Sequence, residues 1–166
     1  DIISEEKNMR FSFVHEADTM EAWIDPIYFD KIIMNLLSNA FKYTADGGEI
    51  QVTLTTGTDD NETGALHHYA EVSVTDTGIG LDVDDVNKVF DRFYRAQINL
   101  TSVTLGLGIG LNYSRILVEM HHGRIAAESR RDTKGSRFSF RIPLGSSHLR
   151  EEEMVHDDTP FVFNKE

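Results

Sequence analysis

The chain has 166 residues, of which 40% are hydrophobic, so it is long enough for one domain with a substantial core and short for two. Its 16 basic and 28 acidic side chains give a formal net charge of -12, which argues against a nucleic-acid binder because such proteins neutralise phosphates with Lys and Arg. The chain has no Cys, which excludes disulfides, thiolate catalysis and Cys-ligated zinc.

The first half of the chain predicts short strands, a long helix and a hairpin. Residues 9 to 14 alternate and residues 22 to 24 are apolar, so we expect two short strands or a hairpin there. After a capping Asp25, apolar side chains recur from Pro26 at the spacing of an amphipathic helix, and Asp-Gly-Gly at 46–48 ends it. Residues 49–56 and 68–75 predict an antiparallel hairpin with a loose loop at 57–64.

The second half predicts two helices, a mobile loop and a final strand pair. We expect helices at 82–90 and from 109 to about 121, separated by a mobile loop at 91–107 that ends in glycines. Residues 123–128 and 137–142 predict two strands around a turn. The acidic stretch 145–166 is expected to be a linker or tail, in which Phe161-Val162-Phe163 could dock on the domain.

This order of elements predicts an α+β fold, a two-layer sandwich in which helices cover one face of a largely antiparallel sheet. We expect a ligand pocket between the helical layer and the glycine-flanked loop. The adjacent histidine pairs at 67–68 and 121–122 point to different faces of any regular element, so we expect structural roles for them rather than metal binding.

Asn35, Asn39 and Lys42 form a polar arc on the first predicted helix, at positions i, i+4 and i+7. The arc flanks the apolar stripe instead of lying opposite it, and such edge positions line pockets. The two amides offer oxygens to Mg²⁺, and the ammonium can meet phosphate oxygens. The alternative interpretation is a helix face that is simply solvated.

Asp76 directly follows a predicted strand, and Gly78 and Gly80 come two and four residues later. A carboxylate at this place can accept a hydrogen bond from an exocyclic amine such as that of adenine, and the glycines let the backbone close on a planar ring. The alternative is that Asp-Thr-Gly forms only a turn.

A second glycine cluster, Gly106, Gly108 and Gly110, leads directly into the third predicted helix. Backbone N–H groups at the positive end of a helix can hold a polyphosphate. The cluster is not a P-loop, because no G-x-x-x-x-G-K-[ST] occurs, and it is not a Rossmann motif, because a polar loop precedes it instead of a strand.

In their order, these motifs closely resemble the N, G1, F, G2 and G3 boxes of the catalytic domains of bacterial sensor histidine kinases. The matching stretches are Asn-x-x-x-Asn-Ala-x-Lys-Tyr at 35–43, Asp-x-Gly-x-Gly at 76–80, Phe-Asp-Arg-Phe-Tyr-Arg at 90–95, Gly-x-Gly-x-Gly-Leu at 106–111 and Gly-Ser-Arg-Phe at 135–138. The resemblance covers residues 9–144 and implies the Bergerat ATP-binding fold with a mobile ATP lid. Ser136 stands where the family usually has Thr.

The resemblance implies a role for each matching position. Asn35, Lys42 and Arg95 would be catalytic, with Lys42 and Arg95 approaching phosphate oxygens, and Asn35 and Asn39 would face Mg²⁺. Asp76 would accept from the adenine amine. Phe93 would anchor the lid, which runs from Arg95 to Gly106, or belong to the core. The residues expected to bind the nucleotide are Asn39, Tyr43, Asp76, Gly78, Gly80, Phe93, Gly106, Gly108, Gly110, Leu111 and Ser136.

Hydrolytic relatives of these kinases carry a Glu four residues before the metal-binding Asn, where this chain has Asn35. An amide cannot act as a carboxylate base, so transfer of the γ-phosphoryl group to another nucleophile is favoured over hydrolysis. His15-Glu16 imitates an acceptor motif, but the following residues do not match it, so we expect the acceptor histidine to lie outside this chain. The alternatives are an ATP-binding interaction module without phosphotransfer and a gyrase-class ATPase.

The resemblance also implies how the chain is organised. We expect a lead-in from a dimerisation domain at 1–8, the catalytic domain at 9–144 and an acidic linker at 145–166. The expected partners are the dimerisation and phosphoacceptor helices of the same kinase and a downstream receiver domain, in the same chain if the kinase is a hybrid. No apolar run reaches the roughly 20 residues of a membrane span, so we expect no direct membrane contact. The resemblance implies that these residues are a cytoplasmic part of a membrane-anchored sensor.

Overall fold

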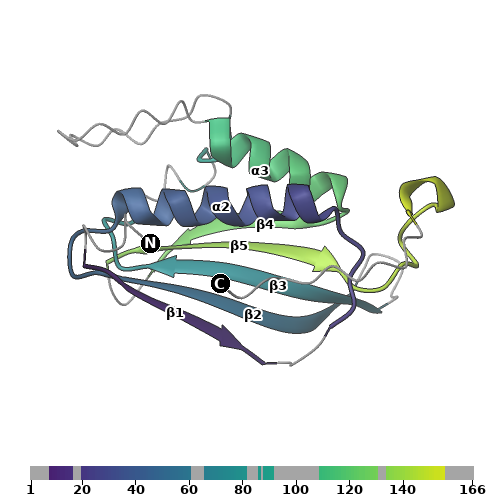
Figure 1. Ribbon diagram of the computed structural model, residues 1–166, viewed down its shortest axis with the longest axis horizontal. Coiled ribbons are helices and arrows are strands. Elements are labelled where there is room, and N and C mark those ends of the chain that lie inside the picture. The colour runs from purple at the N-terminus through teal and green to yellow at the C-terminus, as the bar shows by residue number, and fades with distance from the viewer. Residues whose placement is uncertain are drawn as a thin grey trace.

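The computed structural model describes residues 8–16, 20–60, 66–81, 86, 88–91, 109–130 and 134–155. They form two layers, a five-stranded sheet and two helices that both lie on one of its faces (Figure 1). The helices are α2 (Pro26–Tyr43) and α3 (Ile109–Met120). The predicted α+β two-layer sandwich is therefore confirmed.

The sheet has the strand order β1-β2-β3-β5-β4. The strands are β1 (Arg10–His15), β2 (Glu49–Asp60), β3 (Leu66–Asp76), β4 (Arg124–Ser129) and β5 (Ser136–Pro143). β1 pairs with β2 in parallel, and the other neighbours pair antiparallel. The predicted hairpin of residues 49–56 with 68–75 and the final strand pair are both confirmed.

The hairpin strands are longer than predicted, because the pairing continues through Gly57 to Asp60. Gly57 is paired with Tyr69, and a Cβ at Gly57 would lie 2.4 Å from the Tyr69 hydroxyl oxygen. The missing side chain therefore makes room for the tyrosine across the strand, and the glycine does not end the strand.

The first predicted strand is present as β1, but the hairpin alternative and a second strand at 22–24 are wrong. β1 forms no hairpin with residues 22–24 but lies along the edge of β2, and residues 22–24 contribute only a single bridge from Ala22 to Gly145. The partner of β1 begins at Glu49, far along the chain, so the local alternation that predicts a strand carries no information about which strand it joins.

α2 forms where the sequence predicts it. The Asp25 side chain caps its start by accepting hydrogen bonds from the N–H groups of Ile27 and Tyr28, at 3.0 and 3.3 Å. The helix ends at Tyr43, and the Thr44 hydroxyl donates to the Ala40 carbonyl at 2.7 Å. One face of the helix is fully buried against the sheet and consists of Ile32, Leu36 and Ala40.

The core lies between the helices and the sheet. Alternate residues of β3 and β5 point toward the helices, among them Val72, Val74, Phe138 and Phe140, all of which are buried. Complete burial of one such side chain stabilises the fold by roughly 1.5 to 3 kcal/mol. Asp76 follows the same alternation, so the core packing of β3 directs its carboxylate to the helical side of the sheet.

The helix predicted at 82–90 falls mostly outside the described residues. Residue 86 and residues 88–90 are described, and they lie in turns. Phe90 is buried there and packs edge-on against Phe138, with the ring centroids 6.3 Å apart. The mobile loop predicted at 91–107 lies outside the described residues after Asp91. α3 and the turn that ends at Gly123 agree with the prediction.

Residues 145–155 contact the rest of the chain. The Gly145 N–H donates to the Glu21 carbonyl at 3.2 Å, and a 3-10 helix, η1 (Glu151–Glu153), brings the Glu153 carboxylate to 3.0 Å from His122 Nε2. Part of the predicted linker is thus attached to the domain, and residues 156–166 lie outside the described part.

Within this attachment, the contact between Glu153 and His122 includes a titratable carboxyl whose pKa is lowered. The backbone N–H of Arg150 and then the His122 side chain hold the pKa of Glu153 below its usual range. Because the folded-state pKa is depressed, the contribution of this contact to stability is present above the ordinary carboxyl pKa and is lost as the pH falls through the folded value.

Within the described ranges, neither helix is of the length and apolarity that a bilayer crossing requires.

Candidate functional site

The C-terminal end of α2 lies directly against the turn that follows β3. The Ile79 N–H donates to the Tyr43 carbonyl at 3.3 Å. Gly78 is buried in this contact, and a Cβ added to it would lie 2.1 Å from the Tyr43 oxygen. The glycine is therefore required by the close approach of the two backbones, whatever else binds there.

Asp76 joins this turn to the start of β5. Its side chain is 1% exposed; Oδ1 accepts from the N–H groups of Gly78 at 2.9 Å and Ser136 at 3.3 Å, and Oδ2 accepts from the Ser136 hydroxyl at 2.7 Å. Each carboxylate oxygen can accept two hydrogen bonds, so Oδ2 keeps the capacity for one further donor.

Two glycines let the turn before β5 pack onto the Asp76 turn. Gly135 has a φ of +129°, and a Cβ there would lie 1.9 Å from the Asp76 carbonyl oxygen. Gly80 has a φ of +78°, a left-handed conformation that favours glycine. Arg130 adds a long hydrogen bond from Nη1 to the Asp76 carbonyl, at 3.4 Å. The backbone around the carboxylate is therefore in contact with the turn before β5 and with Arg130.

The middle of α2 contacts the first turn of α3. Asn35 Nδ2 donates to the Gly110 carbonyl at 3.2 Å and to the Ser114 hydroxyl oxygen at 3.1 Å. Further along, the Asn112 amide donates to the Phe90 carbonyl at 2.9 Å. The start of α3 is thus tied to α2 on one side and to the turn at 88–90 on another.

Gly110 differs from the other glycines of the site. It is exposed, and a Cβ there would come no closer than 3.8 Å to the Asn35 amide, which is an ordinary van der Waals contact. The protein's own packing does not require a glycine at 110. A requirement for glycine at this position would therefore come from a ligand that approaches the backbone.

α2 thus brings the predicted site residues of three segments to one side of the sheet. Asn35, Asn39 and Tyr43 are half-buried on α2, with Lys42 exposed beside them. Leu111 is half-buried on α3 and packs against the core. Four residues of the predicted site lie outside the described residues: Phe93, Arg95, Gly106 and Gly108.

Sequence reasoning missed Ser114, Asn112 and Arg130 as parts of the site. Ser114 is fully buried and occupies a core position of α3, three residues before the buried Leu117. A polar residue on an otherwise apolar stripe was the available signal, because a buried hydroxyl requires hydrogen-bond partners. Asn112 and Arg130 act through backbone carbonyls, which no sequence pattern marks.

The histidines of the α3 end have structural contacts. The His121 ring accepts from the Asp25 N–H through Nε2 at 3.0 Å and donates to the Leu117 carbonyl through Nδ1 at 2.7 Å. Across the described segments, no group of three or more His, Cys, Asp or Glu side chains could hold a metal ion. A cation at this site would depend on amide oxygens, water and ligand phosphates, a donor set that fits Mg²⁺.

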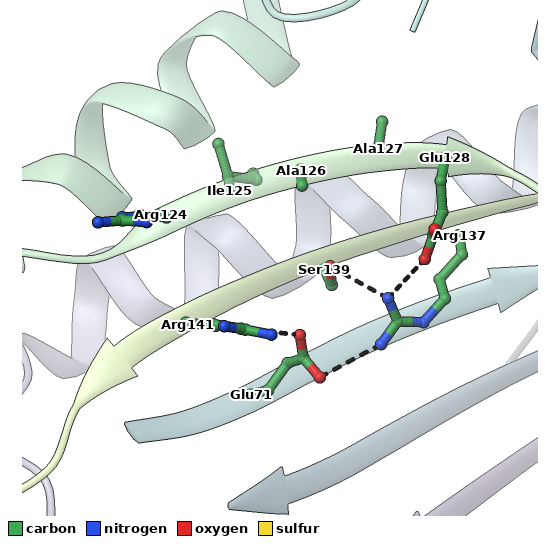
Figure 2. A pocket seen from close by; sticks show the side chains of 9 residues that line it. All are labelled: Glu71, Arg124, Ile125, Ala126, Ala127, Glu128, Arg137, Ser139 and Arg141. Atoms are coloured by element: carbon green, nitrogen blue, oxygen red, sulfur yellow. Dashed lines mark hydrogen bonds and ion pairs between the residues drawn. The ribbon is translucent and has the colours of Figure 1, made fainter. Parts of the chain in front are cut away.

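A separate pocket of 320 Å³ lies on the other face of the sheet. Figure 2 shows Arg137 reaching from β5 between Glu71 of β3 and Glu128 of β4. The Arg137 guanidinium lies 3.3 Å from the Glu71 carboxylate and 2.7 Å from the Glu128 carboxylate, and the Arg141 guanidinium lies 3.2 Å from the Glu71 carboxylate. These side chains alternate with the buried Phe138 and Phe140, so they point away from the helices. The pocket is therefore separated from Asp76 by the sheet.

The chain is similar in sequence to a known protein family and to several of its members. A family model described as histidine kinase-, DNA gyrase B- and HSP90-like ATPase matches residues 24–146. Histidine kinase P4 of Formosa agariphila is 29% identical over 153 residues, covering 90% of this chain and 10% of that protein. Sensor histidine kinase RppB of Synechocystis is 33% identical over 125 residues, covering 75% of this chain and 25% of that protein. The chain thus spans a quarter or less of these relatives.

Among solved structures, the nucleotide-free catalytic domain of histidine kinase ThkA has a TM-score of 0.68 and 25% identity, over 85% of this chain and 82% of that one. ThkA has also been solved in complex with the response regulator TrrA. In that structure it matches at a TM-score of 0.63 and 26% identity, over 86% of this chain and 36% of that one.

The contrast between two glycines gives a test of the site geometry. Gly78→Ala should lower the free energy of unfolding by about 1 to 3 kcal/mol, because the new methyl group collides with the Tyr43 carbonyl. Gly110→Ala should leave stability unchanged or raise it by up to about 1 kcal/mol, because alanine favours the helix. Urea unfolding of both variants measures this, and equal destabilisation would contradict the assignment of Gly110 to ligand approach.

Proposed function

This chain belongs to the histidine kinase-, DNA gyrase B- and HSP90-like ATPase family, and from that premise we propose that it binds Mg-ATP and donates the γ-phosphoryl group to a histidine on a separate phosphoacceptor domain. The proposal rests on the contacts that join three chain segments: the amide-bearing face of α2, the Asp76 turn and the first turn of α3. One nucleotide can contact all three, since α2 touches both of the other segments.

The adenine amine would be bound by Asp76. Its Oδ2 has one acceptor site left after the bond from Ser136, and the surrounding hydrogen bonds hold the carboxylate in place before the ligand arrives. Gly78 contacts this carboxylate, Tyr43 contacts Gly78 and Gly80 contacts Gly135, so the base would bind where α2 ends.

The phosphates would bind along the start of α3. The first N–H groups of a helix have no partner within the helix, and the helix dipole adds positive potential there. Lys42, exposed near the end of α2, would meet phosphate oxygens as well. Gly106, Gly108, Phe93 and Arg95 are assigned to the nucleotide only through the resemblance in sequence.

Asn35 and Asn39 would provide the protein oxygens for Mg²⁺. When bound, this ion neutralises charge on the phosphates, and it prefers oxygen ligands while keeping several waters. Two amides one helical turn apart on α2, with no described carboxylate cluster beside them, suit a cation that binds mainly through the nucleotide.

Transfer is favoured over hydrolysis because Asn35 stands where a water-activating carboxylate would be needed. Its Nδ2 is already donating to α3, and an amide oxygen does not take up a proton at neutral pH. In the transfer, the bond from the γ-phosphorus to the bridging oxygen breaks, ADP leaves with that oxygen, and an imidazole nitrogen of the acceptor forms the new bond. The protein's part is to position the reactants and neutralise charge.

The acceptor and the downstream partners would lie outside these residues. His15 ends the edge strand β1, whereas the family's acceptor lies on a helix. We propose that the partners are the dimerisation and phosphoacceptor helices of the same kinase and then a receiver domain, in the same chain if the kinase is a hybrid. The ThkA complex with a response regulator supports such a partner. The whole protein would be a membrane-anchored sensor with these residues in the cytoplasm.

Incubation with γ-labelled ATP tests the transfer. The chain alone should remain unlabelled, and addition of the phosphoacceptor helices of the same kinase should move the label to their histidine. Labelling of His15 in stoichiometric amount would contradict an external acceptor. Tight binding without transfer would support an interaction module instead, and rapid release of free phosphate would support a gyrase-class ATPase.

The adenine assignment is tested with Asp76→Asn. The amide keeps one acceptor for the Gly78 and Ser136 N–H groups but presents an NH₂ group to the base, so ATP affinity should fall by about 1.5 to 3 kcal/mol, roughly ten- to a hundredfold. Inosine triphosphate has a carbonyl in place of the amine. The same Asp76→Asn substitution should therefore lower the affinity for inosine triphosphate less than that for ATP, or raise it.

Calorimetric titration of the wild type, Asp76→Asn and the exposed-turn control Asp46→Asn measures these affinities, with thermal unfolding to confirm the fold. Equal affinity of wild type and Asp76→Asn for ATP would remove Asp76 from the base-binding site.

A further inference from the structure

Ser114 is a buried polar side chain to which neither the sequence motifs nor the proposed function assigns a role. It belongs to α3, has no exposed surface and faces the middle of α2. A buried hydroxyl is costly unless it is hydrogen-bonded, and Ser114 makes its bonds to two groups of the candidate site, the Gly110 carbonyl and the Asn35 amide.

Three groups form a closed set of hydrogen bonds. The Ser114 hydroxyl donates to the Gly110 carbonyl at 2.8 Å, one helical turn earlier. With its only proton used, the hydroxyl oxygen can only accept, and Asn35 Nδ2 donates to it at 3.1 Å. The same Nδ2 donates to the Gly110 carbonyl at 3.2 Å.

This arrangement determines which end of the Asn35 amide faces α3. A flipped amide would place Oδ1 against the Gly110 carbonyl, which is also an acceptor, and the Ser114 hydroxyl could donate to Oδ1 only by giving up its own bond to that carbonyl. The NH₂ end is therefore held against α3. Oδ1 is left for other ligands, and it lies 3.8 Å from the place of a Cβ on the exposed Gly110.

We propose that Ser114 is a positioning residue, which orients the Asn35 amide so that its oxygen, and not its NH₂ group, is presented to the nucleotide-bound Mg²⁺. The inference rests on the proposed function, because it takes Asn35 as a residue that faces the metal. It adds that a hydroxyl on α3, together with the Gly110 carbonyl, holds the α2 amide in the orientation that can serve a cation.

A purely structural serine would behave differently. If Ser114 only satisfied the Gly110 carbonyl, its removal would lower the stability of α3 and leave the metal dependence of nucleotide binding unchanged. If it acts through Asn35, its removal leaves only the Gly110 carbonyl to hold the amide, and the NH₂ group faces the cation for a larger part of the time.

The test compares the wild type, Ser114→Ala, Asn35→Ala and the double variant. Calorimetry gives ATP affinity with excess Mg²⁺ and with EDTA, and the ratio of the two affinities reports the contribution of the metal. We expect Ser114→Ala to reduce this ratio about three- to tenfold, the effect of one lost hydrogen bond, while affinity in EDTA stays the same. The double variant should have the ratio of Asn35→Ala alone, because Ser114 has nothing left to orient.

A second measurement does not depend on nucleotide. The side-chain NH₂ protons of Asn35 should exchange slowly with solvent in the wild type and several-fold faster in Ser114→Ala, as followed by NMR. Ser38→Ala, at an exposed position of α2, is the matched control and should change neither the exchange nor the affinity ratio.

Either of two results would overturn the inference. One is an unchanged Asn35 exchange rate together with an unchanged ratio in folded Ser114→Ala, and the other is an additive effect in the double variant. Failure of the nucleotide-binding part of the proposed function has its own signature, since the wild type would then bind no ATP in either buffer, whatever the exchange rates of the Asn35 protons.

Discussion

The site depends on the buried Asp76 carboxylate and the backbone that closes around it. Asp76 accepts three hydrogen bonds, two of them from Ser136, which join the end of β3 to the start of β5. Gly78 and Gly135 permit the Tyr43 and Asp76 carbonyls to approach where any side chain would collide. A buried carboxylate that is already hydrogen-bonded needs no reorganisation to accept one more donor, so this part of the site is formed before a ligand arrives.

The second determinant is that α2 serves the core and the site at once. Its buried stripe of Ile32, Leu36 and Ala40 packs on the sheet, and Asn35 and Asn39 each precede a stripe residue by one position. One residue corresponds to about 100° of rotation around a helix, so the amides come to lie at the edge of the stripe. The packing of the apolar face therefore sets the direction of the amides, and a shift in that packing would move the site.

Local patterns predicted most of this structure, and they failed where the cause is distant in sequence. The Asp25 cap, the apolar stripe of α2 and the alternation of β3 are short-range signals, and the elements they predict are present. The parallel pairing of β1 with β2 depends on a partner beyond a whole helix, which no local pattern encodes. The candidate site follows the same rule. Its motif residues could be named from spacing and from the resemblance to a family, whereas the contact of Ser114 with Asn35 requires knowing that α3 lies across that residue.

We expect one nucleotide to meet α2, the Asp76 turn and the start of α3 at the same time. Titration of the isotope-labelled chain with a non-hydrolysable Mg-ATP analogue, followed by backbone amide NMR, tests it most directly. The amide signals of Asn39, Gly78 and Gly110 should shift together along one binding curve with a single dissociation constant. Shifts confined to one of these segments, or centred on Arg137 and Arg141 across the sheet, would contradict it.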